Sequence, residues 1–231
     1  MTTFALVHGA WHDASCWQQL SPALQAAGHD VVVVDLPSDD PSASFSDYAD
    51  VVVRSLEGVT DDVVLVGHSL AGHTIPLVAA RRPVRRLVYL CALVAVPGRG
   101  FAEQLQEEPQ MLVPGYERGL RVQADGCRVW ADDALAVQTF YDDCPADLAA
   151  AAVARLRPQS PAPYLVPCPL EVLPSAPATY VVCTEDRLVD PAWSRRVARD
   201  HLHAELVELP GGHSPFLSRP TELAQTLLRL G

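Results

Sequence analysis

Basic residues are few in this sequence and form no cluster. Lysine and arginine together number 17 against 28 aspartate and glutamate residues, which gives a formal net charge of -11 at pH 7. Adjacent basic residues occur as short pairs such as Arg81–Arg82 and Arg195–Arg196. Nucleic acids and anionic membranes are bound by clustered positive charge. We therefore expect neither as a partner.

Long hydrophobic runs are missing as well. The longest candidate, from Leu87 to Pro97, is interrupted by Tyr89 and falls short of the roughly 18 residues that a membrane-spanning helix needs. The first residues carry no basic segment of the kind that begins a secretory signal peptide. These absences predict a cytoplasmic protein without a membrane span.

Cysteines at metal-binding or redox spacing are also absent. The six cysteines are scattered along the chain, and no two form a CxxC pair. His201 and His203 are two residues apart, but no third ligand accompanies them. We therefore expect no metal and no cofactor, and we interpret most of the cysteines as small buried apolar residues.

The chain does contain enough apolar residues for one substantial core. It has 231 residues, of which 49 % are hydrophobic and 19 % charged, as is typical of a single globular domain. Runs rich in β-branched residues lack polar alternation, which predicts strands buried on both faces of a parallel sheet. Four such runs are found first: Phe4–Val7, Val31–Val34, Val63–Val66 and Leu87–Leu93. Two further strands, Thr179–Cys183 and Glu205–Leu209, are expected where the alternation returns near the end of the chain.

Helix-length stretches separate these runs, so we expect an α/β fold with a mostly parallel six-stranded sheet flanked by helices. The alternation stops between about residues 97 and 177, where helical stretches precede a proline-dense run that excludes regular helix and central strand. This segment is too apolar for a flexible linker. We interpret it as an ordered cap inserted over the carboxyl edge of the sheet. The expected helices are 15–27, 44–56, 71–81, 132–139, 145–156, 191–201 and 220–230.

The strongest chemical signal is a serine between small residues, directly after a buried strand. Ser69 follows the strand that begins at Val63, and a helix is expected behind it. A serine hydroxyl is a weak nucleophile unless a sharp turn presents it beside a base and a helix N-terminus. Such a turn needs small residues two positions on either side, and Gly67 and Ala71 stand there. The sequence thus predicts a nucleophile elbow, with alanine where glycine is usual.

A base and an acid should follow later in the chain, in the order serine, acid, histidine. His213 lies in a glycine-rich loop between the last expected strand and the last helix. Three carboxylates compete for the acid position after the fifth strand: Glu185, Asp186 and Asp190. Asp190 precedes a proline, which favours a helix cap. We favour Asp186 over Glu185 as the group that orients the imidazole.

An oxyanion hole requires two backbone N–H groups near the serine. We assign them to Leu70, after the nucleophile, and to Ala10, in the turn after the first strand. For substrate contacts and pocket walls we name Trp11, His68, Trp130 and Phe216, with Trp193 as a further candidate; each of them is also compatible with a purely packing role.

Four segments in order resemble the α/β-hydrolase superfamily: residues 8–17, 67–72, 184–191 and 211–216. Within it, the chain is similar to the small-cap branch that holds plant methyl-ester esterases, plant hydroxynitrile lyases and bacterial esterase relatives. The match covers the whole length except the cap. It implies the triad Ser69, Asp186 and His213.

The function predicted is hydrolysis of a small, largely apolar carboxylic ester through an acyl-enzyme, without a cofactor. The acidic and apolar character of the cap argues against strongly anionic substrates. Alternatives are a biosynthetic thioesterase, cyclase or lyase with the same triad, and a non-catalytic ligand receptor. The resembled lyases use a lysine after the catalytic histidine and a threonine in the first turn, where this chain has Ser214 and Gly9. The oligomeric state stays open, and a homodimer is compatible with the sequence.

Overall fold

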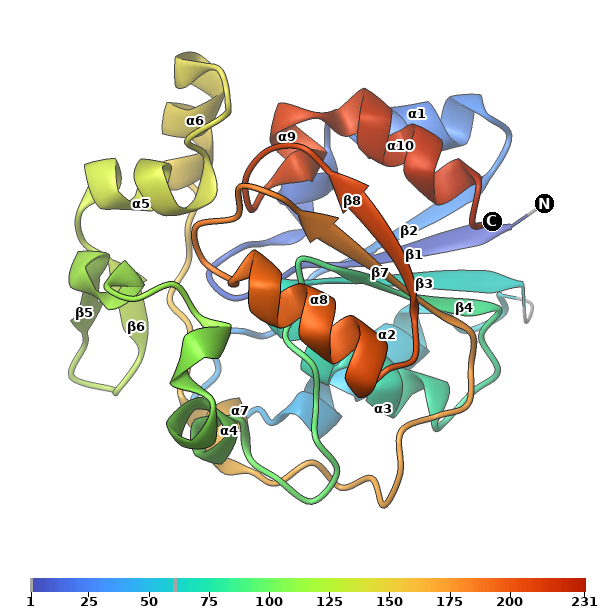
Figure 1. The fold of residues 1–231 in the computed structure, drawn as a ribbon, viewed down its shortest axis with the longest axis horizontal. Helices are drawn as coiled ribbons and strands as arrows, with labels where there is room; N and C mark the ends of the chain where they lie inside the picture. Colours follow the sequence, from blue (N-terminus) through green and yellow to red (C-terminus); the bar gives the residue numbers. More distant parts are fainter. Residues whose placement is uncertain (1, 60–61) are drawn as a thin grey trace.

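Six parallel strands form the central sheet of the protein (Figure 1). The computed structural model describes residues 2–59 and 62–231. The strands lie in the order β2-β1-β3-β4-β7-β8, which confirms the predicted mostly parallel sheet. Their bounds are Thr3–Val7 (β1), Asp30–Val34 (β2), Val63–His68 (β3), Arg86–Leu90 (β4), Ala178–Cys183 (β7) and Glu205–Leu209 (β8).

Helices cover both faces of this sheet, as Figure 1 shows. On one face lie α1 (Ser21–Ala26), α9 (Pro215–Ser218) and α10 (Pro220–Leu228), and on the other α2 (Phe45–Ser55), α3 (Ile75–Ala79) and α8 (Pro191–Asp200). Alternate strand residues enter separate cores: Leu6 packs in the core of α1 and α10, whereas Leu65 packs in the core of α2, α3 and α8. The central strands β1 and β3 are buried on both faces and are therefore largely apolar. The edge strands β2 and β8 are partly exposed, and β8 carries Glu205 and Glu208.

Two expected helices are shorter than predicted, each at a proline. The stretch 15–27 is a 3-10 helix, η1 (Ala14–Trp17), followed by α1, and the stretch 71–81 is a 3-10 helix, η2 (Ser69–His73), followed by α3. Pro22 and Pro76 stand near the starts of α1 and α3. Neither has the N–H that a continuous helix would bond to the carbonyl four residues earlier.

The expected strand 87–93 is also shorter, because β4 ends at Leu90. Cys91 has a φ of 47°, which removes the chain from the extended conformation of a strand. The backbone then crosses the edge of the sheet, where the Leu93 N–H donates to the Ser69 carbonyl at 3.0 Å.

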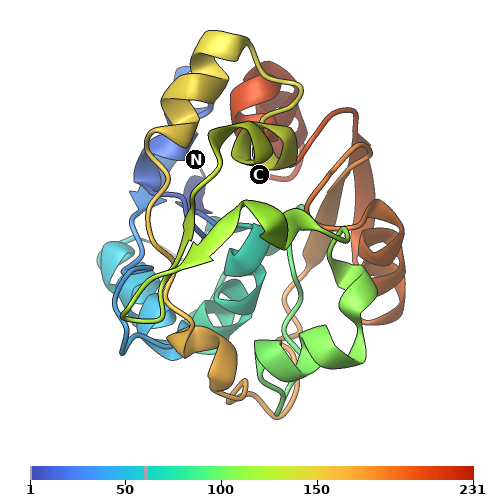
Figure 2. The same cartoon turned by 90° about the vertical axis from the view of Figure 1, so that its left-hand side faces the viewer.

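Most of the segment 97–177, called the cap segment below, lies at the carboxyl ends of the strands, and the chain after residue 165 returns to the amino end of β7 (Figures 1 and 2). It contains an antiparallel hairpin, β5–β6, that the sequence analysis did not predict, since each strand has only three residues. No helix of the described residues is long and apolar enough to span a membrane. The elements of the cap segment are α4 (Phe101–Glu107), η3 (Pro109–Met111), η4 (Tyr116–Gly119), β5 (Leu120–Val122), β6 (Arg128–Trp130), α5 (Asp133–Phe140), α6 (Ala146–Val153) and α7 (Ala162–Leu165).

Candidate active site

Ser69 stands at the sharp turn between β3 and η2, with a φ of 53°. This left-handed conformation is strained for a residue with a side chain and is typical of functional positions. The turn depends on two glycines. A Cβ on Gly67 would lie 2.7 Å from a side-chain carbon of Ile75, and one on Gly72 would lie 1.8 Å from the carbonyl oxygen of Leu93. Gly67 and Ala71 are the small residues predicted from the sequence to shape this turn. Gly72, where an added Cβ would have the least room, was not predicted.

The His213 imidazole is held by the Asp186 carboxylate. His213 Nδ1 donates to Asp186 Oδ2 at 2.8 Å, and both side chains are buried. The second carboxylate oxygen accepts the N–H groups of Leu188 at 2.7 Å and Val189 at 3.0 Å. With its proton on Nδ1, the neutral ring has a lone pair at Nε2, which has no hydrogen-bond partner among the described residues.

The two competing carboxylates lie elsewhere. Glu185 is exposed. Asp190 caps α8 by accepting the Trp193 N–H at 2.8 Å, which is the capping role that the proline after it indicated. Of the three candidates, Asp186 is the one in contact with His213.

His68, expected from the sequence to contact substrate, ties the serine turn to the histidine loop in the structure. Its side chain is fully buried, and its Nε2 donates to the carbonyl of His213 at 2.9 Å. The two rings are 4.6 Å apart between centroids. Burial, followed by the charges of nearby histidines, lowers the pKa of His68 well below its usual value. A neutral ring wedged between two loops positions them and leaves no surface for a ligand.

The turn after β1 passes directly over the serine. A Cβ on Gly9 would lie 2.7 Å from the Cβ of Ser69, so glycine is required there for close approach. Ala10 and Leu70 line the same cavity as Ser69. Their backbone N–H groups are therefore near enough to this cavity to be considered as oxyanion donors.

Side chains and backbone from within the turn and from the cap segment bind successive carbonyl groups of this turn. His12 Nδ1 donates to the Ala10 carbonyl at 2.8 Å. Arg157, which follows α6 in the cap segment, donates its backbone N–H to Trp11 at 2.7 Å and its guanidinium to the His12 carbonyl at 3.1 Å. The cap segment thus fixes the backbone that carries Ala10.

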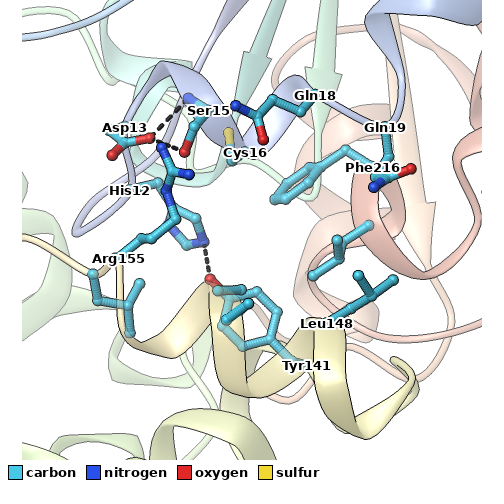
Figure 3. A pocket seen from close by; sticks show the side chains of 14 residues that line it. His12, Asp13, Ser15, Cys16, Gln18, Gln19, Tyr141, Leu148, Arg155 and Phe216 are labelled. Atoms are coloured by element: carbon cyan, nitrogen blue, oxygen red, sulfur yellow. Dashed lines mark hydrogen bonds between the residues drawn. The ribbon is translucent and has the colours of Figure 1, made fainter.

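Besides Ala10, His12 has a second hydrogen-bond partner, which lies in the cap segment. His12 was not among the functional residues predicted from the sequence. Burial is the main cause that lowers its pKa to about 3, so the ring is neutral at physiological pH. Because Nδ1 carries the proton, Nε2 accepts from the Tyr141 hydroxyl at 2.9 Å, as Figure 3 shows. The residue is an ordinary histidine in a turn, and only the contact between distant segments shows its role.

His12 and Tyr141 border a cavity of about 130 Å³ that does not include Ser69 (Figure 3). Phe216 lies on this cavity, packed against Trp17 and His68. Phe216 is not among the residues that line the cavity at Ser69, where the sequence placed it, and its ring belongs to the aromatic packing near the histidine loop.

A separate cavity of about 240 Å³ opens at Ser69. Trp11 lies on its wall, as the sequence analysis expected. Trp130 does not, because its ring packs edge-on against Trp11 and Phe140. Trp193 is also outside it and donates its indole N–H to Glu108 at 2.7 Å. The remaining wall residues come mostly from the cap segment: Phe101, Ala102, Leu105, Gln106, Leu112, Tyr116, Arg128 and Tyr164, with Leu93 and Leu188 outside it.

Cys91, Asp186 and His213 form the one group of metal-ligand residue types found close together among the described residues, with their ligand atoms within 4.8 Å of one another. Burial raises the pKa of the Cys91 thiol well above its usual value. A protonated thiol is a poor metal ligand, and the Asp186–His213 hydrogen bond already occupies the other two groups. The cluster therefore fits an acid–base pair better than a metal centre.

Comparison with known proteins places this arrangement in a family. Residues 4–226 match the Alpha/beta hydrolase family. The chain is 28 % identical to Pyrethroid hydrolase from Sphingobium wenxiniae, over 98 % of this chain and 86 % of that protein. It is 25 % identical to Methylesterase 2 from Arabidopsis thaliana, over 98 % and 95 %.

A solved pyrethroid hydrolase from Sphingobium faniae JZ-2 superposes with a TM-score of 0.83 at 23 % identity, covering 99 % of this chain and 96 % of that one. This likeness concerns the fold. Together with the matched residues, it shows that the protein belongs to the alpha/beta hydrolase family.

Proposed function

We propose that the protein hydrolyses carboxylic esters through an acyl-enzyme formed on Ser69. The observation that carries the proposal is the buried hydrogen bond between His213 and Asp186, which leaves the lone pair of His213 Nε2 free to accept a proton. The loop of His213 is joined to the strained serine turn through His68. Relatives named as a hydrolase and a methylesterase support this class of reaction.

Each residue has one task in the proposed mechanism. Ser69 Oγ attacks the ester carbonyl while His213 Nε2 takes its proton, and Asp186 stabilises the imidazolium that forms. The N–H groups of Ala10 and Leu70 donate to the negative oxygen of the tetrahedral intermediate. His213 then returns the proton to the departing alcohol. In the second half of the reaction, His213 takes a proton from a water molecule that attacks the acyl carbonyl, and the carboxylic acid leaves as Ser69 regains its proton. No cofactor takes part.

The preferred substrates are small esters with apolar groups next to the scissile bond. The cavity of about 240 Å³ leaves little room for a polymer, and its wall near Ser69 is built from Leu70, Leu93 and Leu188. Burial of apolar substrate surface against such a wall favours binding by about 25 cal/mol per Å².

Gly9 and Ser214 argue against the lyase alternative. Threonine could not replace Gly9 without displacing the serine turn, since a Cβ there would lie 2.7 Å from Ser69 Cβ. Ser214 is buried and neutral, so it supplies no positive charge for a departing cyanide. A receptor function would not require the buried acid–base pair.

Thioesters remain a second substrate class for the same acyl chemistry.

The test is a series of p-nitrophenyl esters of graded acyl length, with a thioester and mandelonitrile alongside. We expect turnover of short-chain esters and no cyanide release. Ser69→Ala should lower the rate by on the order of 10⁴- to 10⁶-fold with an unchanged unfolding transition. Retention of more than about a percent of the activity in that variant, or Ser69-dependent cyanide release, would contradict the proposal.

A further inference from the structure

One end of the cavity at Ser69 differs from the rest of its wall because it carries a positive charge. Arg128 of β6 lines this cavity and is only partly buried, and among the described residues its guanidinium has no ion pair and no hydrogen bond. The other partly buried arginines of the described chain each have a polar partner: Arg82, Arg86, Arg157, Arg195, Arg196 and Arg219. Arg128 is thus the exception.

The backbone of Arg128 is fixed although its side chain is free. Its N–H donates to the Gln159 carbonyl at 2.9 Å, and its own carbonyl accepts from Gln159 N–H at 2.9 Å and from Trp11 Nε1 at 3.0 Å. The hairpin therefore presents the guanidinium from a rigid position. The Arg128 side chain takes no part in these backbone bonds. Its positive charge is therefore not needed to hold the hairpin in place.

Two tyrosine hydroxyls accompany the guanidinium. Tyr116 and Tyr164 line the same cavity, and neither hydroxyl has a hydrogen-bond partner among the described residues. The three side chains line one cavity. Burial raises the pKa of both phenols, and the charge of Arg128 opposes this rise in each. All three are hydrogen-bond donors at physiological pH, and an acceptor for them is lacking.

Arg128 also stands where the cavity meets a wider groove. Leu105, Leu112 and Tyr116 line both, as does Arg128 itself, and the groove adds a volume of about 700 Å³ between η3, η4 and the β5–β6 hairpin. A substrate that extends from Ser69 toward the groove would pass the guanidinium. Arg128 is the only charged residue on the described wall of the cavity.

We propose that Arg128, with Tyr116 and Tyr164, forms a carboxylate-binding subsite for the end of the substrate away from the scissile bond. The substrate class is then an ester whose apolar chain ends in a carboxylate. This inference rests on the proposed ester hydrolysis at Ser69. A guanidinium matches a planar carboxylate with two parallel hydrogen bonds, and its single charge fits a carboxylate better than a phosphate, which carries about two charges.

The proposed subsite departs from the expectation that the cap disfavours anionic substrates. The net charge of -11 belongs to the whole molecule, and charges beyond about 8 Å are largely screened at physiological ionic strength. Arg128, in contrast, borders the cavity directly. The positive charge of Arg128, rather than the net charge of the molecule, therefore determines whether the cavity binds a substrate that ends in a carboxylate.

Matched ester pairs test the subsite. Methanol release is measured from the monomethyl esters of adipic, pimelic and suberic acid and from methyl hexanoate, heptanoate and octanoate. We expect kcat/KM of the wild type to favour the carboxylate member at one chain length. Arg128→Gln should reduce that preference, measured as the ratio of kcat/KM for the carboxylate ester to kcat/KM for the neutral ester of the same length, by about 10- to 100-fold, as expected for loss of charge-assisted hydrogen bonds.

Two variants serve as controls. Arg121→Gln removes an exposed arginine of the same hairpin that has no ion pair and does not line the cavity, and it should keep the preference. Arg128→Lys keeps the charge but loses the two parallel hydrogen bonds, so it should retain only part of the preference and fall between wild type and Arg128→Gln. Binding is measured independently by calorimetry. The inactive variant Ser69→Ala is titrated with the monomethyl esters of adipic, pimelic and suberic acid, each of which carries one free carboxylate. Binding should be lost when Arg128→Gln is added.

The outcomes separate this inference from the proposed function. Ser69-dependent hydrolysis of the neutral esters with no preference for any carboxylate partner, or a preference that survives Arg128→Gln, would overturn the subsite and leave the esterase intact. Failure of Ser69 to support hydrolysis of any ester would overturn the proposed function first.

Discussion

Asp186 joins two loops by a single carboxylate. One oxygen holds His213, and the other accepts two backbone N–H groups from the loop that leads to α8. The side chain therefore has a fixed orientation before any substrate binds. A carboxylate held in this way selects the imidazole tautomer that leaves Nε2 free.

Replacement of Asp186 by asparagine should impair ester hydrolysis more than any other change in its loop. The amide favours the wrong imidazole tautomer, which costs on the order of 10⁴-fold in comparable triads. Glu185→Gln and Asp190→Asn serve as matched controls and should retain most of kcat, although Asp190→Asn is expected to destabilise α8 slightly. A larger loss of kcat in Asp190→Asn than in Asp186→Asn would show that the acid has been misassigned.

Cap and sheet meet at the turn that carries Ala10. His12 and Arg157 bind successive carbonyls of the turn, and Tyr141 holds His12 from α5's end. The cap segment thus acts on the proposed oxyanion hole as well as on the shape of the pocket. Substitutions there should affect rate as well as specificity.

Tyr141→Phe tests this connection. The change keeps the ring but leaves His12 Nε2 without its donor, and an unsatisfied buried acceptor costs about 1 to 3 kcal/mol. We expect kcat for a short ester to fall about 3- to 10-fold with KM nearly unchanged. Tyr89→Phe is the control, since that buried residue lies in β4 and its hydroxyl has no hydrogen bond among the described residues. Equal kcat values for the two variants would argue against the connection.

The serine turn itself sets a limit on substitution. Gly72→Ala should lower the free energy of unfolding by about 3 kcal/mol or more, because the new Cβ would lie 1.8 Å from the Leu93 carbonyl oxygen. Ala71→Gly at the adjacent position should cost only about 1 kcal/mol. Urea unfolding measures both. A Gly72→Ala variant as stable as the wild type would mean that the turn is less tightly packed than described.

The elements that sequence could predict are those with local signals. β3, the serine turn and the loop of His213 are recognisable because apolar runs and small residues mark them within a few positions. The β5–β6 hairpin has only three residues a strand and no such signal. Likewise, Arg128 is informative only because no side chain in the described part of the chain pairs with its guanidinium, and His12 because Tyr141 donates a hydrogen bond to it. Both are tertiary facts that no local pattern contains.

At the scale of the whole molecule, buried histidines make the fold sensitive to acid. Burial is the main cause that lowers the pKa of His12 and of His73 to about 3, and it lowers that of His68 well below its usual value. In the unfolded chain these rings take up protons near their ordinary pKa of about 6.5. The unfolded state therefore binds more protons below that pH, and stability falls as the pH falls from about 6.5 toward 3.

In this window each buried histidine lowers the free energy of unfolding by up to about 1.4 kcal/mol for each pH unit of acidification. The three together give a slope of about 4 kcal/mol per pH unit. Urea unfolding at pH 7.5 and at several values down to pH 4.5 measures the slope. His73→Phe should reduce it by about a third, because His73 stacks against Phe45 and its Nε2 has no hydrogen-bond partner among the described residues. His201→Gln, an exposed control, should leave it unchanged. A flat profile in the wild type would contradict the burial of these rings.

The central claim is that Ser69 is the nucleophile activated by His213, and covalent labelling tests it most directly. The protein is treated with a fluorophosphonate, and the adduct is located by intact-mass measurement and peptide mapping. We predict one adduct per chain, on Ser69, and at least a hundredfold slower labelling of His213→Ala, since general-base assistance contributes about 10²- to 10⁴-fold. Labelling of another serine such as Ser214, or equal rates in wild type and His213→Ala, would contradict the account.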